Sequence, residues 1–355
     1  MKKLYFSYFL FVFLTAAAQE PAGYYNSAIG LEGTAMQQAL HTIIKGHNAI
    51  SYSALWNSFE NTDKKANGKV WDMYSDVPGG TPPYQYTFFS DQCGNYNSEG
   101  DCYNREHSFP RSWFGGTVAP MNTDLFHIYP TDGYVNGKRD NYPYGEVGTA
   151  SWTSLNGSKL GTSITPGYSS VVFEPIDAYK GDFARTYFYM ATRYLGEDSN
   201  WPGSPMVNGS QPKSWALQLL HSWHQDDPVS AKEIARNNAV YAIQNNRNPY
   251  IDHPEFVEIV WFDPSGIDEP YFSASDFSVY PNPTADILYI NSTLEVTQQP
   301  LIYSLSDATG RIITTVQADG QKLNSISLTE LPHGFYLLHI TDQASRKSIN
   351  YKIFH

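Results

Sequence analysis

The sequence predicts an α+β region that is followed by a small all-β domain. Apolar residues recur at helical spacing in the segments 30–61, 180–194 and 214–243. Residues 100–134 show no helical period, which favours strands and loops. From about Phe277 onward, short runs rich in β-branched and aromatic residues alternate with turn signals. A mixed region therefore comes first, and a strand-only region ends the chain.

Each helix of the first region is predicted from its apolar spacing and from residues that start or stop it. The helix after Pro228 has proline in its first turn, and an apolar set predicts its core face: Ile234, Ala235, Val240, Tyr241 and Ile243. Helices are expected in these segments: two within 30–61, a short one from about Val135, a long one within 173–194, one from Ser214, one after Pro228 and a short one at 254–261.

Strands are predicted where β-forming residues cluster between turn signals. In the first region they are Val70–Tyr74 and Tyr84–Phe89, separated by a Pro/Gly-rich loop. Two further strands are expected within 100–134, before the short helix. Six runs near the C-terminus have the short, even spacing of a small β-sandwich. These runs are 287–290, 301–305, 311–316, 325–328, 334–340 and 348–353.

The N-terminus has the pattern of a Sec signal peptide. Lys2 and Lys3 precede the apolar run Leu4–Leu14, and alanines at 16–18 form a cleavage site. A membrane anchor is the alternative, but the run is short for a spanning helix. No other stretch is apolar enough to span a bilayer, so no stable membrane insertion is expected. The predicted organisation is a signal peptide at 1–18, a main domain at 19–262, a linker at 263–276 and a β-sandwich at 277–355.

The two cysteines, Cys93 and Cys102, are expected to form a disulfide. An even count in an exported chain favours a bridge, which would stabilise the fold by about 2–3 kcal/mol. A two-cysteine metal site is the alternative, but partner ligands at the usual spacing are missing.

Glu106 and His107 are the first candidate site. A carboxylate is a hard oxygen ligand that suits Mg²⁺, and an adjacent imidazole can serve as a base. Glu106 beside Arg105 is also compatible with a surface charge pair, and His107 with a buried structural histidine. Two downstream motifs favour the functional reading, because amide and cationic groups gather there: Asp124-Leu-Phe-His-Ile-Tyr-Pro130 and Val135-Asn-Gly-Lys-Arg-Asp-Asn-Tyr142.

Together these motifs resemble the secreted endonuclease I family. The resemblance continues through Phe173-Glu-Pro175 and Lys180–Met190 to Asn246-Arg-Asn-Pro249, and it covers roughly residues 30–262. Several motifs in the expected order are more specific than any one of them. The resemblance implies a ββα-metal (His-Me finger) core surrounded by helices.

The resemblance also implies the chemistry and the roles of individual residues. His107 would be the general base, and Glu106 and Asn136 would bind a divalent metal, Mg²⁺ or alternatively Mn²⁺ or Ca²⁺. The expected activity is sequence-nonspecific hydrolysis of DNA, with RNA as a second candidate substrate, to 5′-phosphate products. In isolation, Asn136-Gly137 is an ordinary turn. His127 and Asn141 are predicted to be structural.

The phosphate-binding arginine stays open, because relatives carry it in an insertion that this chain lacks. Arg111, Arg139 and Arg185 are candidates, and Arg139 is preferred as a catalytic residue because it lies one helical turn from Asn136. The formal net charge of −12 excludes general affinity for nucleic acid. A local basic rim is therefore needed, and Lys180, Arg185 and Arg247 are expected to supply it.

The C-terminal region resembles the sorting domain of type IX secretion substrates. The residues that carry the resemblance are Tyr280-Pro-Asn-Pro283, Asp307-Ala-Thr-Gly-Arg311 and Leu331-Pro-His-Gly-Phe-Tyr336. It implies recognition by the type IX machinery and a secreted or cell-surface protein. A glycan- or protein-binding β module is the alternative, which would make the chain a non-enzymatic adhesin.

A different metal hydrolase is the other rival. His221 and His224 lie three residues apart, a spacing that can hold a transition metal. A peptidase of that kind would need a His-Glu-x-x-His motif, which is missing here. A monomer is expected.

Overall fold

The structure is a computed structural model that describes residues 20–262, 272, 276–293, 301–307, 311–318, 321–342 and 348–355. The chain divides into two compact units, residues 1–261 and 262–355. The predicted signal peptide and most of the predicted linker lie outside the described residues.

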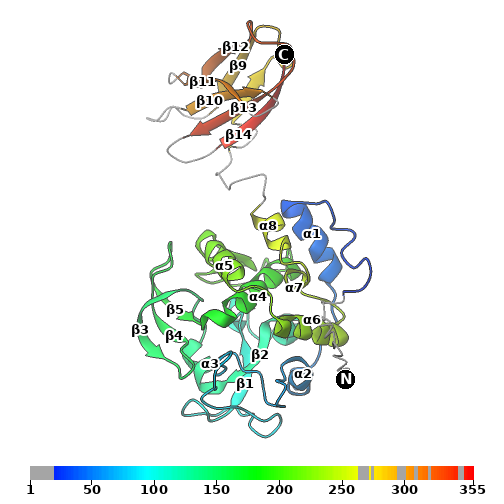
Figure 1. Ribbon diagram of the computed structural model, residues 1–355, viewed down its shortest axis with the longest axis vertical. Helices are drawn as coiled ribbons and strands as arrows, with labels where there is room; N and C mark the ends of the chain where they lie inside the picture. The colour runs from blue at the N-terminus through cyan, green and yellow to red at the C-terminus, as the bar shows by residue number, and fades with distance from the viewer. Residues whose placement is uncertain are drawn as a thin grey trace, which may run out of the picture. The chain divides into compact units, whose positions relative to one another are not determined.

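The first unit contains all helices of the described residues and three small sheets (Figure 1). The α-helices are α1 (Gly33–Ile44), α2 (Leu55–Thr62), α3 (Gly133–Arg139), α4 (Lys180–Arg193), α5 (Ser214–Asp226), α6 (Ala231–Gln244), α7 (Pro249–Asp252) and α8 (Phe256–Trp261). Short 3₁₀ helices are η1 (Arg111–Phe114), η2 (Met121–Thr123), η3 (Leu125–His127) and η4 (Asp177–Tyr179). The strands are β1 (Tyr103–His107), β2 (Ile128–Asp132), β3 (Val147–Thr153), β4 (Lys159–Ser163), β5 (Val171–Glu174), β6 (Val207–Asn208) and β7 (Gln211–Pro212).

Strands β1 and β2 and helix α3 form one compact supersecondary unit. The strands pair antiparallel, with Glu106 opposite Tyr129 and His107 opposite Ile128. The side chain of Asp132, the last residue of β2, accepts a hydrogen bond from the backbone N–H of Val135 and caps α3. Helix α3 contacts both strands. The two strands and short helix predicted between residues 100 and 142 are thus present.

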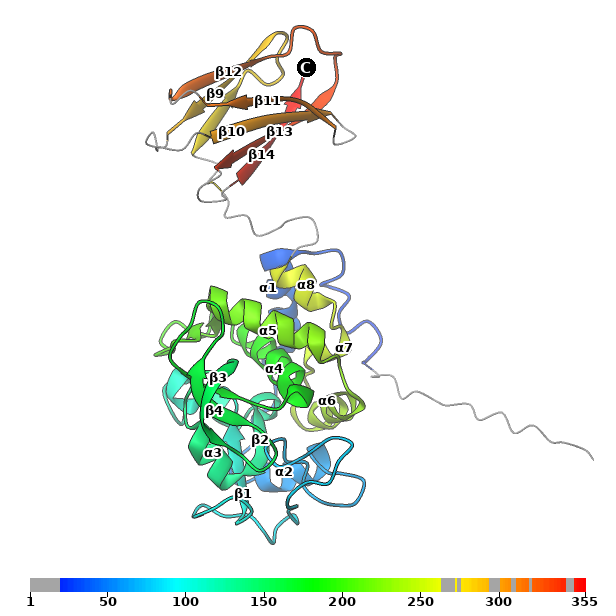
Figure 2. The same cartoon turned by 60° about the vertical axis from the view of Figure 1, so that its left-hand side comes forward.

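Helix α4 is the centre of the unit. In both views β1, β2 and α3 lie below it, and α1, α5, α7 and α8 lie above it (Figures 1 and 2). Every residue from Lys180 to Arg193 is buried. Because no face of α4 meets solvent, its charged residues must be neutralised by partners inside the unit.

Two sequence predictions in this unit are wrong. Residues 70–74 and 84–89 are not strands: Val70 forms only an isolated bridge with Lys64, and Phe89 has a φ of +65°. The rings of Tyr74, Tyr86 and Phe88 are buried from loops, and the hydroxyls of Tyr74 and Tyr86 bind buried carboxylates. High β propensity here reflects aromatic packing rather than a ladder of backbone hydrogen bonds.

The predicted core face of α6 is also wrong. Ala235 is exposed and Ile234, Tyr241 and Ile243 are only half-buried, whereas Val240 is buried as expected. The rest of the buried face is polar and consists of Lys232, Glu233, Arg236, Asn237 and Gln244. The helix turns this face inward because each charged residue on it finds an opposite charge or a carbonyl oxygen there.

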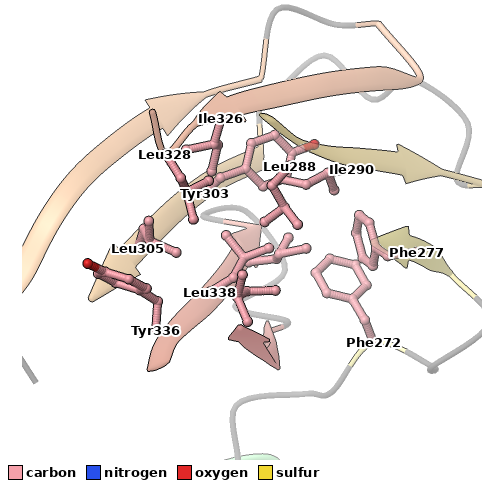
Figure 3. Close-up of a cluster of buried hydrophobic side chains, with 12 residues drawn as sticks. Phe272, Phe277, Leu288, Ile290, Tyr303, Leu305, Ile326, Leu328, Tyr336 and Leu338 are labelled. Atoms are coloured by element: carbon pink, nitrogen blue, oxygen red, sulfur yellow. The ribbon is translucent and has the colours of Figure 1, made fainter. Parts of the chain in front are cut away.

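The second unit is all-β, as the sequence predicts. Its strands are β8 (Phe277–Tyr280), β9 (Ile287–Ser292), β10 (Leu301–Asp307), β11 (Ile312–Gln317), β12 (Leu323–Ser327), β13 (Phe335–Asp342) and β14 (Ser348–Phe354). They form two antiparallel sheets with the orders β11-β10-β13-β14 and β12-β9-β8. Side chains from both sheets meet in one apolar cluster (Figure 3).

Within the part of the chain that the structure describes, every helix is too short or too polar to cross a bilayer.

Candidate active site

A pocket of about 300 Å³ opens where β1 ends and α3 passes beside it. We call it the central pocket. Strand β1, helix α3 and η1 each contribute side chains to it, and the loop before α2 closes one side. Its lining is Tyr52, Arg105, Glu106, His107, Pro110, Arg111, Ser112, Asn136, Asp140 and Asn141.

Glu106 is a buried carboxylate at the floor of this pocket. Its Oε1 accepts a hydrogen bond from the hydroxyl of Tyr74 at 2.9 Å and lies 3.3 Å from the guanidinium of Arg139. Burial raises the pKa of Glu106, and the nearby Arg139 and Tyr74 only partly oppose this effect. A further positive charge in the pocket would therefore stabilise the ionised carboxylate.

His107 lies among three rings at the end of β1. Tyr52 stacks beside it, and His127 and Phe114 meet its ring at centroid distances of 5.5 and 6.4 Å. Its Nε2 lies 3.3 Å from the carbonyl oxygen of Asn122. Because a carbonyl only accepts, the tautomer with hydrogen on Nε2 leaves the lone pair on Nδ1.

The same surroundings keep the imidazole of His107 neutral. Burial and the neighbouring His127 hold the pKa of His107 well below its usual range. A neutral imidazole at pH 7 can accept a proton, which is what a general base must do.

Asn136 presents its amide from α3. Its Nδ2 donates to Oδ1 of Asn104 at 2.7 Å, and none of the described residues donates to its own Oδ1. The carbonyl oxygen of this amide is therefore available to another group in the central pocket.

The donor set of the pocket fits a hard divalent cation. Glu106 and Asn136 offer a carboxylate and an amide oxygen, the ligand types that Mg²⁺ and Ca²⁺ prefer. Within the described residues, no group of three or more His, Cys, Asp or Glu side chains is arranged to hold a metal. A cation at Glu106 would therefore take its remaining ligands from water and phosphate oxygens, as Mg²⁺ commonly does.

Two arginines supply positive charge in the central pocket. The guanidinium of Arg105 lies 3.8 Å over the ring of Tyr52 and donates to the Tyr52 carbonyl oxygen at 3.1 Å. Arg111 lies farther along the wall, and its Nε is buried with no hydrogen-bond partner among the described residues. Guanidinium groups that line a pocket can donate to an anionic oxygen that enters it.

Arg105 and Tyr52 were not among the predicted site residues. Arg105 could have been found, because residues two apart in a strand share a face and His107 is the candidate base. Tyr52 carries no such signal, since it comes from a distant loop.

The structure places Arg139 beneath the pocket rather than in it. Its guanidinium is fully buried, donates to the carbonyl oxygens of His107 and Ser108 at 3.1 and 2.6 Å, and pairs with Glu106. It therefore holds the end of β1 in place and does not reach the space open to a phosphate.

The other predicted basic residues also lie away from the central pocket. Lys180 pairs with Glu146, Glu174 and Asp177 at 2.8–3.0 Å. Arg185 binds Glu233, with 2.9 Å between NH2 and Oε2, and Arg247 binds Asp252. These three cations are buried in ion pairs, so the structure does not bring them together as a rim.

The histidines of the rival metal site have separate partners. His221 binds the carboxylate of Glu258, whereas His224 lies 3.3 Å from Arg185 and 3.1 Å from the Pro254 carbonyl oxygen. Burial and the adjacent Arg185 lower the pKa of His224 to about 4. Its nitrogens are already engaged, which does not favour metal binding.

The disulfide between Cys93 and Cys102 is present, with 5.8 Å between the Cα atoms. It closes the loop that enters β1. The backbone N–H of Cys93 also donates to the carbonyl oxygen of Tyr103, the first residue of that strand. The bridge thus anchors the start of the strand that carries Glu106 and His107.

Comparison with known proteins shows which families the two parts of the chain match. The family model described as Endonuclease I matches residues 32–255, and the model described as Secretion system C-terminal sorting domain matches residues 278–354.

Three curated relatives show how far the similarity extends. An extracellular ribonuclease of Bacillus amyloliquefaciens is 37% identical over 246 residues, which cover 67% of this chain and 78% of the relative. One from Bacillus subtilis (strain 168) is 34% identical over 250 residues, with the same coverage of both chains. Endonuclease-1 of Buchnera aphidicola subsp. Baizongia pistaciae (strain Bp) is 30% identical over 131 residues, covering 37% of this chain and 46% of that protein. The chain belongs to the endonuclease I family and is a nuclease that ends in a secretion-system sorting domain.

Proposed function

We propose that the chain is a secreted, metal-dependent endonuclease that hydrolyses the phosphodiester bonds of DNA and RNA without reading base sequence. One observation carries the proposal: Glu106, His107 and Asn136 line the same pocket as two arginines. The relatives support both substrates, because two are named ribonucleases and a 24% identical protein of Aeromonas hydrophila is named a deoxyribonuclease.

His107 acts as the general base in this proposal. Its neutral imidazole takes the proton of the attacking water through Nδ1, while the Asn122 carbonyl oxygen holds Nε2. The stacked ring of Tyr52 and the ring of Phe114 limit how the imidazole can turn.

Glu106 and Asn136 hold the cation, Mg²⁺ or alternatively Mn²⁺ or Ca²⁺. When bound, the cation supplies charge stabilisation at the phosphate and at the departing 3′ oxygen. Arg139 keeps Glu106 oriented, because it binds both the carboxylate and the carbonyl oxygen of the next residue. A water molecule protonates the departing 3′ oxygen, so cleavage leaves a 5′-phosphate and a 3′-hydroxyl end.

Arg111 and Arg105 bind the phosphate in place of the predicted Arg139. Both arginines line the central pocket, and a guanidinium group matches the oxygens of a phosphate. Contacts to phosphate position a strand but carry no sequence information, which explains cleavage without base preference. A local cationic wall also reconciles nuclease activity with a net charge of −12.

The sorting domain supports a secreted or cell-surface location. We propose that it engages the type IX machinery after Sec export, and that the mature enzyme is a monomer that degrades extracellular nucleic acid.

The test is cleavage of plasmid DNA and of single-stranded RNA by the purified full-length chain, with Mg²⁺ and with a chelator. His107→Ala should lower the rate by about 10²- to 10⁴-fold, the usual contribution of a general base. His221→Ala is the matched control and should retain activity, because His221 lies outside the central pocket. Far-UV circular dichroism verifies that each variant is folded.

The proposal fails if folded wild-type protein leaves both nucleic acids intact, as an adhesin would. It also fails if His107→Ala cleaves as fast as wild type, or if the chelator has no effect. Loss of activity in His221→Ala alone would move the site to the rival histidines.

A further inference from the structure

A second pocket, of about 350 Å³, lies beside the central pocket. We call it the aromatic pocket. Residues from η1, from the segment after α3, from the turn before β5 and from the loop before β6 meet there. Its lining is Ser112, Trp113, Asn141, Tyr142, Pro143, Tyr168, Ser170, Val171, Gly203, Ser204 and Pro205.

The two pockets share one hydrogen-bonded pair of lining residues. Ser112 and Asn141 line both, and Nδ2 of Asn141 donates to Oγ of Ser112 at 3.3 Å. Along η1, Arg111 faces the central pocket and Trp113 lines the aromatic pocket. A ligand that extends out of one pocket over this pair therefore enters the other.

The two pockets differ in charge. The central pocket contains Arg105, Arg111, Glu106 and Asp140, whereas none of the described residues that line the aromatic pocket carries a charge. Hydroxyl and amide groups stand among its aromatic rings. A pocket that carries two arginines and a candidate cation site, next to a neutral aromatic pocket, matches a ligand in which an anionic group is joined to a neutral planar ring.

The rings of the aromatic pocket are held in place and partly open. Tyr168 stacks on Trp215, with 4.5 Å between ring centroids and 8° between planes, and Nε1 of Trp215 donates to the Pro205 carbonyl oxygen. Tyr142 is 36% exposed. Its backbone N–H donates to the carbonyl oxygen of Arg139 at 3.1 Å, which ties Tyr142 to the C-terminal end of α3, the helix that carries Asn136. A pre-positioned ring loses little freedom when it stacks on a ligand.

We infer that the aromatic pocket is a nucleoside subsite, which takes the unpaired base and sugar of the nucleotide next to the scissile phosphate. The inference rests on the proposed function, because the central pocket must hold that phosphate. A base can enter the pocket only when it leaves its stack, which an unpaired strand permits at lower cost than a duplex. Stacking is tolerant of base identity, so the subsite adds affinity without sequence preference.

The test compares single-stranded oligothymidylate with an oligomer of the same length in which every residue is abasic. Both carry the phosphate that the central pocket needs, and only the first carries a base. Full-length wild-type protein should cleave the thymidylate with a kcat/KM about tenfold higher or more. Tyr142→Ala should reduce this preference to about threefold or less, mainly through a higher KM for the thymidylate, and Tyr142→Phe should restore it.

Tyr289→Ala is the matched control, because Tyr289 is also 36% exposed and lies in the second unit. It should keep the full preference. A duplex of the same thymidylate should respond less to Tyr142→Ala than the single strand does.

Three results would overturn the inference. Wild-type protein could cleave both oligomers equally, Tyr142→Ala could slow both by the same factor, or the duplex could respond as strongly as the single strand. If wild-type protein cleaves neither oligomer, the plasmid and RNA assays separate the two claims: cleavage there would overturn the inference alone, and no cleavage there would refute the proposed function.

Discussion

The cores of the two units are built on different principles. In the second unit the buried cluster is aliphatic and aromatic and is shared by the two sheets (Figure 3). In the first unit three arginines, Arg139, Arg185 and Arg247, are among the largest fully buried side chains. An apolar core is specified by the spacing of neighbouring residues in the chain. A charged core is specified by partners that are far apart in the chain.

The distances along the chain make this difference concrete. Arg236 of α6 binds Asp63 across 173 residues, and Arg185 binds Glu233 across 48. Removing water from a charge costs several kcal/mol, so each buried charge is tolerated only if its partner is in place. Formation of these pairs therefore requires the whole unit to be assembled, whereas each strand of the second unit can bury its apolar side in a common cluster.

The largest expected effect comes from breaking one buried pair. Arg236→Met leaves Asp63 as an unpaired buried carboxylate and removes hydrogen bonds to the carbonyl oxygens of Leu125 and Ile128. We expect a loss of about 4 kcal/mol in the free energy of unfolding of the first unit, measured by urea denaturation followed by circular dichroism at 222 nm.

Two further variants make this prediction specific. Lys64→Met breaks the exposed pair with Glu60 and should cost less than about 1 kcal/mol. Asp63→Leu combined with Arg236→Met removes both charges and should be more stable than Arg236→Met alone. If Arg236→Met is no more harmful than Lys64→Met, the buried charges of the first unit are not what holds it together.

The same contrast explains how much of the fold the sequence could predict. Six strands of the second unit follow from runs of β-forming residues, because alternate side chains share one apolar face. Helices were also predicted in the segments of the first unit that form α1 to α6 and α8, whereas α7 was not predicted. The inward face of α6 could not be predicted this way. Lys232 and Arg236 are buried because they bind partners that lie far away in the sequence.

The site shows a similar limit. Local motifs pointed to Glu106, His107 and Asn136, and the structure brings these three into one pocket. The motif could not predict which groups surround each arginine side chain. Arg139 lies near Asn136 in sequence, but its side chain turns inward to Glu106, and Arg111 and Arg105 occupy the wall instead. The spacing of residues along the chain predicts which residues lie near the site, but it does not predict where their side chains point.

A cavity in the apolar core is the second-largest expected change. Leu338 is fully buried in β13, and Leu338→Ala should destabilise the second unit by about 3 kcal/mol. The midpoint of the unfolding transition followed at 222 nm should change little, because the described helices all lie in the first unit. Leu323→Ala is the matched control, since Leu323 is 49% exposed. If Leu338→Ala lowers the free energy of unfolding measured at 222 nm by as much as it destabilises the second unit, the two cores unfold as one.

A smaller effect is expected from pH acting on a buried carboxylate of the first unit. Burial would raise the pKa of Asp124, but His47, His127 and hydrogen bonds from Gln244 and Phe126 together lower it to about 2. A carboxyl with a depressed pKa stabilises the fold above the unfolded pKa, and this contribution is lost as pH falls towards the folded pKa.

Asp124→Asn removes that contribution and should make stability less dependent on pH. Between pH 5 and pH 2 the difference in unfolding free energy between wild type and variant should shrink by about 2 kcal/mol. In the wild-type protein the hydroxyls of Tyr189 and Tyr194 donate to the Asp124 carboxylate. In the variant the new amide can donate to these hydroxyls instead. Parallel pH profiles of the two proteins would contradict this assignment.

The smallest expected effect tests whether a helix start in the charged core is also set by local sequence. Ser230 caps α6: its hydroxyl accepts from the backbone N–H of Glu233, and the Glu233 carboxylate accepts from the backbone N–H of Ser230. The same carboxylate binds Arg185, so the cap helps to orient a buried ion pair. Ser230→Ala should lower the free energy of unfolding by about 1 kcal/mol in urea titrations. Ser214→Ala, at the start of α5 where no side-chain cap forms, should cost less than half of that. Equal losses in the two variants would mean that the cap does not contribute through its hydrogen bond, and that Arg185 alone holds Glu233 in place.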